Sequence, residues 1–134
     1  MAIYIAGPIT GDPDAARKFA TAEDWLKVDF DSSVINPQKI FSSLAKAAPY
    51  EVLIETCCAL AAECEIIAVL PGWEKSYGAC REVLAYLDVP RKWFPDVQQI
   101  GRNFRYWYAL INEAYPTSVD ELKIACRKRI KKGR

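Results

Sequence analysis

The stretch that decides the fold is I-I-A-V-L-P-G-W-E-K-S-Y-G-A-C-R-E, residues 66–82. It opens with the apolar run Ile66 to Leu70, which is typical of a strand buried on both faces of a parallel sheet. Pro71-Gly72 ends that run, as turn residues do. Ser76 is a favourable N-cap, and the apolar spacing after it predicts a helix over Tyr77 to Leu87. Ligands of open α/β sheets bind at the carboxyl ends of such strands, where this loop is expected to lie.

Glu82 is the candidate reactive residue of this strand–loop–helix unit. It lies off the apolar face of the predicted helix, one turn after Gly78, whose missing side chain leaves room for a ligand. Ser76 and the first amides of the helix are expected to face the same cleft, and helix N-termini favour anions. The alternative is that Glu82 is a solvated helix residue and that Gly72 and Gly78 only shape a turn.

A second unit of the same kind opens the chain. Ala2 to Ala6 predicts a strand, the loop Gly7 to Pro13 follows, and Asp12-Pro13 predicts the start of a helix that runs to about Val28. Free amides and the helix dipole make such a glycine loop suitable for a phosphate. A plain turn between a strand and a helix explains the loop equally well.

The rest of the chain continues this alternation and predicts a three-layer α/β fold with a mainly parallel sheet. Both glycine loops then lie at the same edge of the sheet, which brings the first loop and Glu82 to one cleft. The long connection at Gln38 to Pro49 has the character of a binding loop or lid. The other predicted elements are a strand at Val34-Ile35, a short helix at Ile40 to Ala47, a helix at Tyr50 to Cys64, a short strand or packed loop at Arg91 to Phe94, a helix at Gln98 to Ala114, and a last helix that begins with a Ser118–Glu121 capping box and ends near Ile130.

Composition limits the classes of function. The chain has 134 residues, 51% of them hydrophobic and 26% charged, as in a soluble globular domain. Its net charge of +1 gives no overall field for nucleic acid or membrane. No apolar run has the length of a membrane span, and no signal peptide precedes the first strand, so we expect a cytoplasmic protein with no membrane partner.

The cysteine and histidine counts narrow the chemistry further. Because the chain has no histidine, Ser-His-Asp and Cys-His catalysis and histidine-ligated metals are excluded. The five cysteines are an odd number without C-x-x-C spacing, which predicts reduced, buried thiols and no metal site. We expect no cofactor. The basic run at residues 127–134 is interpreted as a solvated helix end, and a nucleic-acid partner is disfavoured.

Two motifs together resemble the nucleoside 2-deoxyribosyltransferase superfamily. They are Y-x-x-G-P-x-T-G at residues 4–11 and L-P-G-W-E-x-S-x-G-A-x-x-E at residues 70–82. The branch with the greatest similarity consists of small bacterial and phage proteins with an L-P-G-W-E loop. The resemblance covers about residues 2–87 and implies a flavodoxin-like (Rossmann-like) fold. Residues 1–94 would form the deoxyribosyltransferase-like domain, and residues 95–134 a C-terminal helical extension packed on it.

The resemblance also implies roles for individual residues. Glu82 would be the nucleophile on C1′ of a 2-deoxyribosyl group, and Tyr4 would position that glutamate and the sugar. Cleavage of an N-glycosidic bond passes through an oxocarbenium-like state, which a carboxylate beneath C1′ stabilises or traps. By similarity to the nucleotide N-hydrolases, Ser76 and the first glycine loop would hold the 5′-phosphate. The implied substrate- and phosphate-binding residues are Gly7, Pro8, Ile9, Thr10, Gly11, Gly72, Trp73, Ser76 and Gly78.

Two positions depart from the superfamily pattern. The aspartate that contacts or protonates the leaving base falls here on Cys57, and a thiol with a pKa of about 8.5 is a poor substitute. Cys57, Glu65 and Glu74 are therefore the candidates for contact with the base. Pro8 stands where the nucleotide hydrolases have a phosphate-binding serine.

Three functions remain open at this point. The first is an N-glycosidase or deoxyribosyltransferase that acts on nucleoside 5′-monophosphates, and the second is a nucleotide-binding protein of the same fold with little or no turnover. The third is an interaction protein that uses its C-terminal helices. A looser similarity to the cytokinin-activating phosphoribohydrolases favours ribonucleotides. The aromatic residues of the C-terminal segment predict a homodimer or larger homo-oligomer, and they are Phe104, Tyr106, Trp107, Tyr108 and Tyr115.

Overall fold

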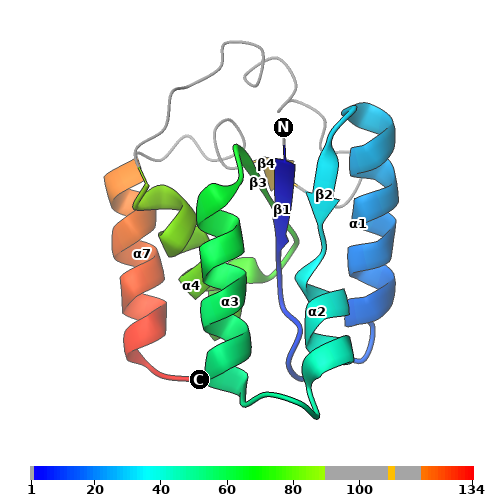
Figure 1. Cartoon of the computed structure of the whole chain (residues 1–134). Helices are drawn as coiled ribbons and strands as arrows, with labels where there is room; N and C mark the ends of the chain where they lie inside the picture. The colour runs from blue at the N-terminus through cyan, green and yellow to red at the C-terminus, as the bar shows by residue number, and fades with distance from the viewer. Residues whose placement is uncertain (1, 90–108, 111–118) are drawn as a thin grey trace.

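Parallel strands form the centre of the molecule. The computed structural model describes residues 2–89, 109–110 and 119–134 (Figure 1). In this part of the chain, strand β1 (Ala2–Ala6) pairs in parallel with both β2 (Ser33–Ile35) and β3 (Ile66–Val69). The predicted α/β fold is confirmed. The strand order β2-β1-β3 is that of the first three strands of a flavodoxin-like sheet.

Alternation along β1 and β3 builds two hydrophobic cores, one on each face of the sheet. Ile3 and Ile5 face the core that α1 covers, whereas Tyr4 and Ala6 face the core of α3, α4 and α7. Figure 1 shows α1 on one side of β1 and these three helices on the other, so the molecule has three layers. The described helices are α1 (Ala15–Asp29), α2 (Pro37–Leu44), α3 (Tyr50–Glu63), the 3-10 turn η1 (Trp73–Lys75), α4 (Tyr77–Leu87) and α7 (Val119–Lys131).

Single side chains cap the starts of α4 and α2, and only the start of α4 was predicted from the sequence. The Ser76 Oγ accepts a hydrogen bond from the Ala79 amide at 3.2 Å, and α4 has the predicted limits. The Asn36 side chain caps α2 in the same way, so Pro37 begins a helix rather than only ending a strand. The prediction for α2 was therefore three residues late at each end.

The start of α1 differs from the prediction. The helix begins at Ala15 rather than Pro13, because the Asp12 carbonyl accepts from the Ala15 amide and closes a separate turn in front of it. The Asp12 carboxylate accepts from the Asp14 amide at 2.9 Å and from the Lys18 amine at 2.9 Å. Asp12 therefore holds the glycine loop rather than capping the helix.

The C-terminal segment differs from the sequence prediction more than the start of α1 does. β4 (Ala109–Leu110) pairs antiparallel with β3, so the helix predicted over Gln98 to Ala114 is wrong at these two residues. The pairing satisfies backbone groups that β3 would otherwise leave open at its edge. The Ser118 cap, the segment at Arg91 to Phe94 and the aromatic residues proposed for a homodimer lie outside the described residues.

Helix α7 belongs to the same core as the parallel strands. Its buried residues Leu122 and Cys126 lie in one cluster with Cys80 and Val83 of α4. All five cysteines are free thiols, and four of them are buried. No helix in the described part of the chain is both long and apolar enough to cross a membrane.

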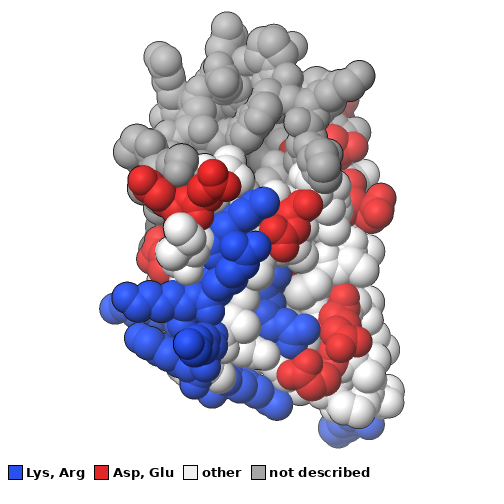
Figure 2. Space-filling view, turned by 90° about the vertical axis from the view of Figure 1, so that its left-hand side faces the viewer, with Lys and Arg blue, Asp and Glu red and all other residues white. Residues whose placement is uncertain are grey.

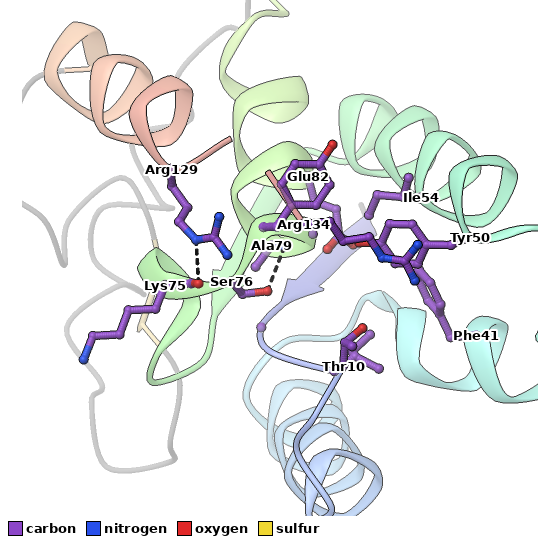
Figure 3. Close-up of a pocket in the computed structure, with 14 residues that line it drawn as sticks. Thr10, Phe41, Tyr50, Ile54, Lys75, Ser76, Ala79, Glu82, Arg129 and Arg134 are labelled. Atoms are coloured by element: carbon purple, nitrogen blue, oxygen red, sulfur yellow. Dashed lines mark hydrogen bonds between the residues drawn. The ribbon is translucent and has the colours of Figure 1, made fainter. Parts of the chain in front are cut away.

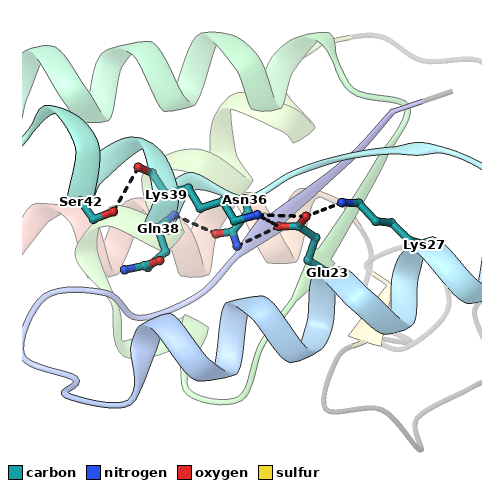
Figure 4. A network of polar contacts seen from close by, with 6 residues as sticks. All are labelled: Glu23, Lys27, Asn36, Gln38, Lys39 and Ser42. Atoms are coloured by element: carbon teal, nitrogen blue, oxygen red, sulfur yellow. Dashed lines mark hydrogen bonds and ion pairs between the residues drawn. The ribbon is translucent and has the colours of Figure 1, made fainter.

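A buried carboxylate fastens α1 to the start of α2 (Figure 4). Glu23 is 6% exposed and accepts from the Asn36 amide at 3.1 Å. The amines of Lys27 and Lys39 lie 2.5 and 3.0 Å from its carboxylate oxygens. Burial alone would raise the pKa of Glu23, but these donors outweigh it and lower the pKa to about 2. The network fixes α2 beside the carboxyl end of β2.

We expect Glu23→Gln to lower the free energy of unfolding by about 1–3 kcal/mol at pH 7, because both lysines lose their anion in a partly buried site. The folded-state pKa lies below the ordinary 4.5, so this stabilisation is present above pH 4.5 and is lost as the pH falls toward 2. Urea unfolding at pH 7 and pH 3 measures the difference, with Glu63→Gln on the exposed face of α3 as the control. An equal deficit at both pH values would show that charge does not carry the effect.

Candidate active site

A cavity of about 180 Å³ opens where the connections leave β1 and β3 (Figure 3). β2 and β3 flank β1, and the loop after β1 leads to α1 on one face while the loop after β3 leads to α4 on the other. Such a point in a parallel sheet leaves a crevice outside the carboxyl ends of the strands. Its lining comes from both of these loops and from α2, α3, α4 and the end of α7. The lining residues are Gly7, Ile9, Thr10, Phe41, Tyr50, Ile54, Lys75, Ser76, Tyr77, Gly78, Ala79, Glu82, Arg129 and Arg134.

Glu82 places a carboxyl group at this cavity, and one oxygen of that group has no partner among the described residues. The residue is 1% exposed, and its Oε2 atom is buried and has no hydrogen-bond partner among the described residues. Burial raises the pKa of Glu82 well above its ordinary value. The alternative that Glu82 is a solvated helix residue is wrong, because the side chain is buried. The core is wide enough to bury Glu82 together with Val83 and Tyr86.

Tyr4 also carries a buried polar atom without a partner, but it lies outside the cavity. Its side chain is fully buried on the face of the sheet that α4 covers, and its hydroxyl has no partner among the described residues. The residue does not line the cavity. The structure therefore gives the sheet side of the core a second unpaired polar atom.

The N-terminus of α4 borders the cavity. Ser76 accepts from the Ala79 amide, whereas the amides of Tyr77 and Gly78 before it have no intrahelical acceptor because they open the helix. The space above Gly78 is filled by α3, because a Cβ there would lie 3.1 Å from the Tyr50 hydroxyl. Gly78 thus lets Tyr50 approach the helix, whereas the sequence assigned that space to a ligand.

The first glycine loop is held tightly to the end of β3. A Cβ at Gly7 would lie 2.9 Å from the Leu70 Cβ, and the Leu70 amide donates to the Ala6 carbonyl at 2.9 Å. Gly7 therefore has to be glycine for the two strand ends to meet. Of the loop residues predicted to bind a ligand, Gly7, Ile9 and Thr10 line the cavity.

Other predicted binding residues have structural places away from the cavity. Gly72 has φ 86°, a left-handed conformation that begins η1, and it lies against Pro8. Gly11 also has a positive φ of 79° in the first loop. Trp73 is 2% exposed and packs in the core, so it offers no stacking surface.

None of the three candidates for contact with the leaving base reaches the cavity. Cys57 is fully buried in the core, and burial raises the pKa of its thiol to about 11. Glu65 precedes β3, at the opposite end of the sheet, where it accepts from the Ala2 amide at 2.6 Å. Glu74 is exposed on η1, on the outer side of the loop. The remaining acidic hydroxyls among the described lining residues are those of Tyr50 and Tyr77.

The cavity has an aromatic side and a basic side that the sequence did not reveal. Tyr50 lies against Phe41 with a ring-centre distance of 5.9 Å, and the Arg134 guanidinium lies 3.5 Å from the centre of the Tyr50 ring. On the opposite side, Arg129 donates to the Lys75 carbonyl at 2.7 Å. Figure 3 shows Arg134 beside Tyr50 and Arg129 above Lys75. The only signal for the two arginines was the basic run that had been interpreted as a solvated helix end.

The lining does not resemble a metal centre. Within the described residues, no group of three or more cysteine, aspartate and glutamate side chains is placed to hold a metal ion. The cavity instead combines one buried carboxyl group, aromatic rings, backbone amides and two guanidinium groups. This set suits an organic anion with an aromatic part.

The family of the chain is shown by its sequence. The model of the DUF4406 family, a domain of unknown function, matches residues 1–90, so the chain belongs to this family. The match includes every element from β1 to α4 and therefore most of the cavity. No curated protein and no solved structure matches the chain.

A buried carboxyl group without a partner costs stability. We therefore expect Glu82→Met to raise the free energy of unfolding by about 1–2 kcal/mol, because an unbranched apolar side chain replaces an unpaired polar group. Thermal and urea unfolding at pH 7 measure the change. Glu82→Gln is the matched control and should change stability less, since it keeps a polar group in place. A less stable Glu82→Met protein would mean that the carboxyl group has a stabilising partner.

Proposed function

We propose that the protein cleaves or transfers the N-glycosidic bond of (deoxy)nucleoside 5′-monophosphates, with Glu82 as the nucleophile. The observation that carries the proposal is the buried, unpaired Glu82 carboxyl group at a cavity at the carboxyl end of the parallel strands. Buried ionisable groups without a partner destabilise the fold, and such groups are concentrated at functional sites. The similarity of the two glycine motifs to the nucleoside 2-deoxyribosyltransferases supports the same role.

The 5′-phosphate is assigned to the side of the cavity with the free amides. Ser76 and the N-terminus of α4 lie there, with Thr10 of the first loop and the guanidinium of Arg129 among the other lining residues. A phosphate is favoured by the helix dipole, by amide donors and by arginine. A ligand phosphate would also supply the anion that Arg129 lacks among the described residues, where its guanidinium donates to two carbonyl oxygens.

The base is assigned to the aromatic side. Phe41 and Tyr50 offer ring surfaces, and the Arg134 guanidinium already lies over the face of Tyr50. A purine or pyrimidine can use the same kind of stacking on Tyr50. This arrangement leaves Glu82 between the two ends of the ligand, where the sugar would lie.

The reaction needs the ionised form of Glu82. A carboxylate oxygen forms a bond to C1′ as the C1′–N bond breaks, and the base leaves with that electron pair and takes up a proton. A water molecule then attacks C1′ of the glycosyl ester and releases the sugar phosphate, which gives hydrolysis. Attack by the nitrogen of a second base in place of water gives transfer. Tyr4 would support Glu82 from the sheet side.

A nucleotide-binding protein with little turnover is the second candidate function. The observation that favours it is that Cys57, Glu65 and Glu74 all lie away from the cavity, which leaves tyrosine hydroxyls as proton donors for the departing base. A tyrosine with a pKa near 10 is a weak acid for this purpose. The homodimer, the nucleotide partner and the absence of a cofactor remain predictions.

We expect Glu82→Gln to keep the fold and to lose base release by about 1,000-fold or more, because the amide cannot act as the nucleophile. Chromatography of reactions with a panel of nucleoside 5′-monophosphates measures the released base. A 2′-fluoro substrate should leave a glycosyl adduct on the unmodified protein, visible by intact mass, and none on the variant. Glu63→Gln is the matched control. Wild-type turnover in Glu82→Gln would exclude this mechanism, and no base release by the unmodified protein would favour the binding function.

The pH dependence distinguishes a nucleophile from an acid at Glu82. The attacking form is the carboxylate, and burial raises the pKa of Glu82, so kcat should rise with pH through a value above 4.5. Rates of base release at saturating nucleotide between about pH 4 and pH 9 measure this profile. Saturation is needed because the phosphate itself ionises near pH 6 and changes binding. A kcat that falls over this range would assign Glu82 the role of a proton donor instead.

A further inference from the structure

The cations of α7 fall into two groups. Lys123 and Arg127 lie 3.2 and 3.7 Å from the Asp88 carboxylate at the end of α4. Lys128, which follows Arg127 directly, and Lys132, just after the end of α7, have no acidic partner among the described residues. One side of α7 is therefore neutralised by the protein itself, and the other side is not.

The unpaired cations border a hollow next to the cavity. Four cationic residues line it, Lys75, Lys128, Arg129 and Lys132, together with Ala125 and one acidic residue, Glu74, and its volume is about 420 Å³. Lys75 and Arg129 also line the cavity that contains Glu82, so the two spaces adjoin at these residues. Figure 2 shows Lys and Arg side chains gathered on the lower part of the face that includes α7, with acidic side chains around them.

Arg129 is fixed at the boundary between the two spaces. Its Nε atom donates to the Lys75 carbonyl and its Nη1 atom to the Gly133 carbonyl, both at 2.7 Å. Figure 3 shows the Lys75 side chain extending away from Glu82. One cation thus points into the hollow from η1, while the guanidinium that joins the hollow to the cavity is held in place.

The helix dipole does not account for this cluster by itself. Basic residues in a last helical turn complement the carbonyl end of the helix, which explains cations on α7 such as Lys128 and Arg129. Lys75 belongs to η1 and lies outside that explanation. The four cations outnumber the one acidic residue of the lining, Glu74, so the hollow keeps an excess of positive charge that an entering anion would offset.

We propose that this hollow is a second anion subsite, which holds the further phosphates of a nucleoside diphosphate or triphosphate beyond the one held in the cavity. The inference rests on the proposed function, because it places the first phosphate at the N-terminus of α4. The next phosphate of the chain then passes Arg129 and enters the space between Lys75, Lys128 and Lys132. Lysine amines suit such outer phosphates as point charges.

A compact polyphosphate fits the observations better than an oligonucleotide does. The hollow is bordered by only two elements, η1 and α7, and it adjoins the cavity directly. A nucleic-acid strand needs a longer basic track, and the next cations along α7, Lys123 and Arg127, are paired with Asp88. Consecutive phosphates need only this short run of positive charge.

Isothermal titration of the full chain tests the subsite. The ligands are a nucleoside, its 5′-mono-, di- and triphosphate, inorganic phosphate and pyrophosphate, and a short single-stranded DNA with a 5′-phosphate. We expect the diphosphate to bind about tenfold more tightly than the monophosphate, and pyrophosphate to bind more tightly than phosphate. Lys128→Gln with Lys132→Gln should remove this gain while it changes monophosphate affinity less than about twofold. Lys123→Gln with Arg127→Gln makes the same change of net charge on the other side of α7 and should leave the gain intact.

Each outcome decides one of the two proposals. A monophosphate that binds more tightly than its nucleoside, with no further gain for the diphosphate or for pyrophosphate, overturns the subsite and leaves the proposed function standing. No binding of any nucleotide, together with binding of pyrophosphate that depends on Lys128 and Lys132, overturns the proposed function and keeps the anion site. If the two double variants lowered the affinity for the diphosphate equally, the tighter binding of the diphosphate would be an effect of net charge alone, and the subsite would be overturned. Tighter binding of the DNA than of the triphosphate would assign the hollow to nucleic acid instead.

Discussion

β3 pairs in parallel with β1 along its whole length, and the position of the cavity depends on this pairing. The two strands end together, with the Leu70 amide bound to the Ala6 carbonyl, and their connections leave to opposite faces of the sheet. Only a glycine at position 7 lets these ends meet, because any side chain there would collide with Leu70. The crevice at this point is thus a consequence of the topology, and the loops around it decide what it can bind.

Glu82 gives the crevice its chemical character, and its burial lowers the stability of the fold while it supplies a group for a reaction. The side chain is nearly inaccessible and one of its oxygens has no partner, so the protein holds a group whose ionised form the interior disfavours. Elsewhere the fold treats a buried carboxylate differently. Glu23 is surrounded by an amide and two lysines, and its pKa is lowered instead of raised. The contrast separates a carboxylate that holds helices together from one that is available for a ligand.

Helix α7 links the C-terminal part of the chain to the crevice. Its apolar side completes the core on α4 through Leu122 and Cys126, which fixes the direction of its polar side. Arg129 then reaches the loop before α4, and Arg134 lies on the ring of Tyr50. The family match covers residues 1–90, so the charged side of the crevice comes from beyond the matched segment. Variation in this helix offers a way to change ligand preference without changing the sheet.

The sequence by itself determined the features that depend on neighbouring residues. The strand, turn and helix over residues 66–87 and the Ser76 cap follow from local apolar spacing and one hydrogen bond, and the α/β alternation followed from repeating such units. Burial was decided by the tertiary structure, because it depends on how many elements pack around a helix. Glu82 therefore turned out to be enclosed, and Cys57 and Glu65 turned out to lie away from the cavity. The strand at Ala109–Leu110 likewise exists because β3 offers it an edge. The meeting of Arg129 with Lys75 joins residues 54 positions apart, and no local pattern records that contact, because packing of the apolar side of α7 alone brings it about.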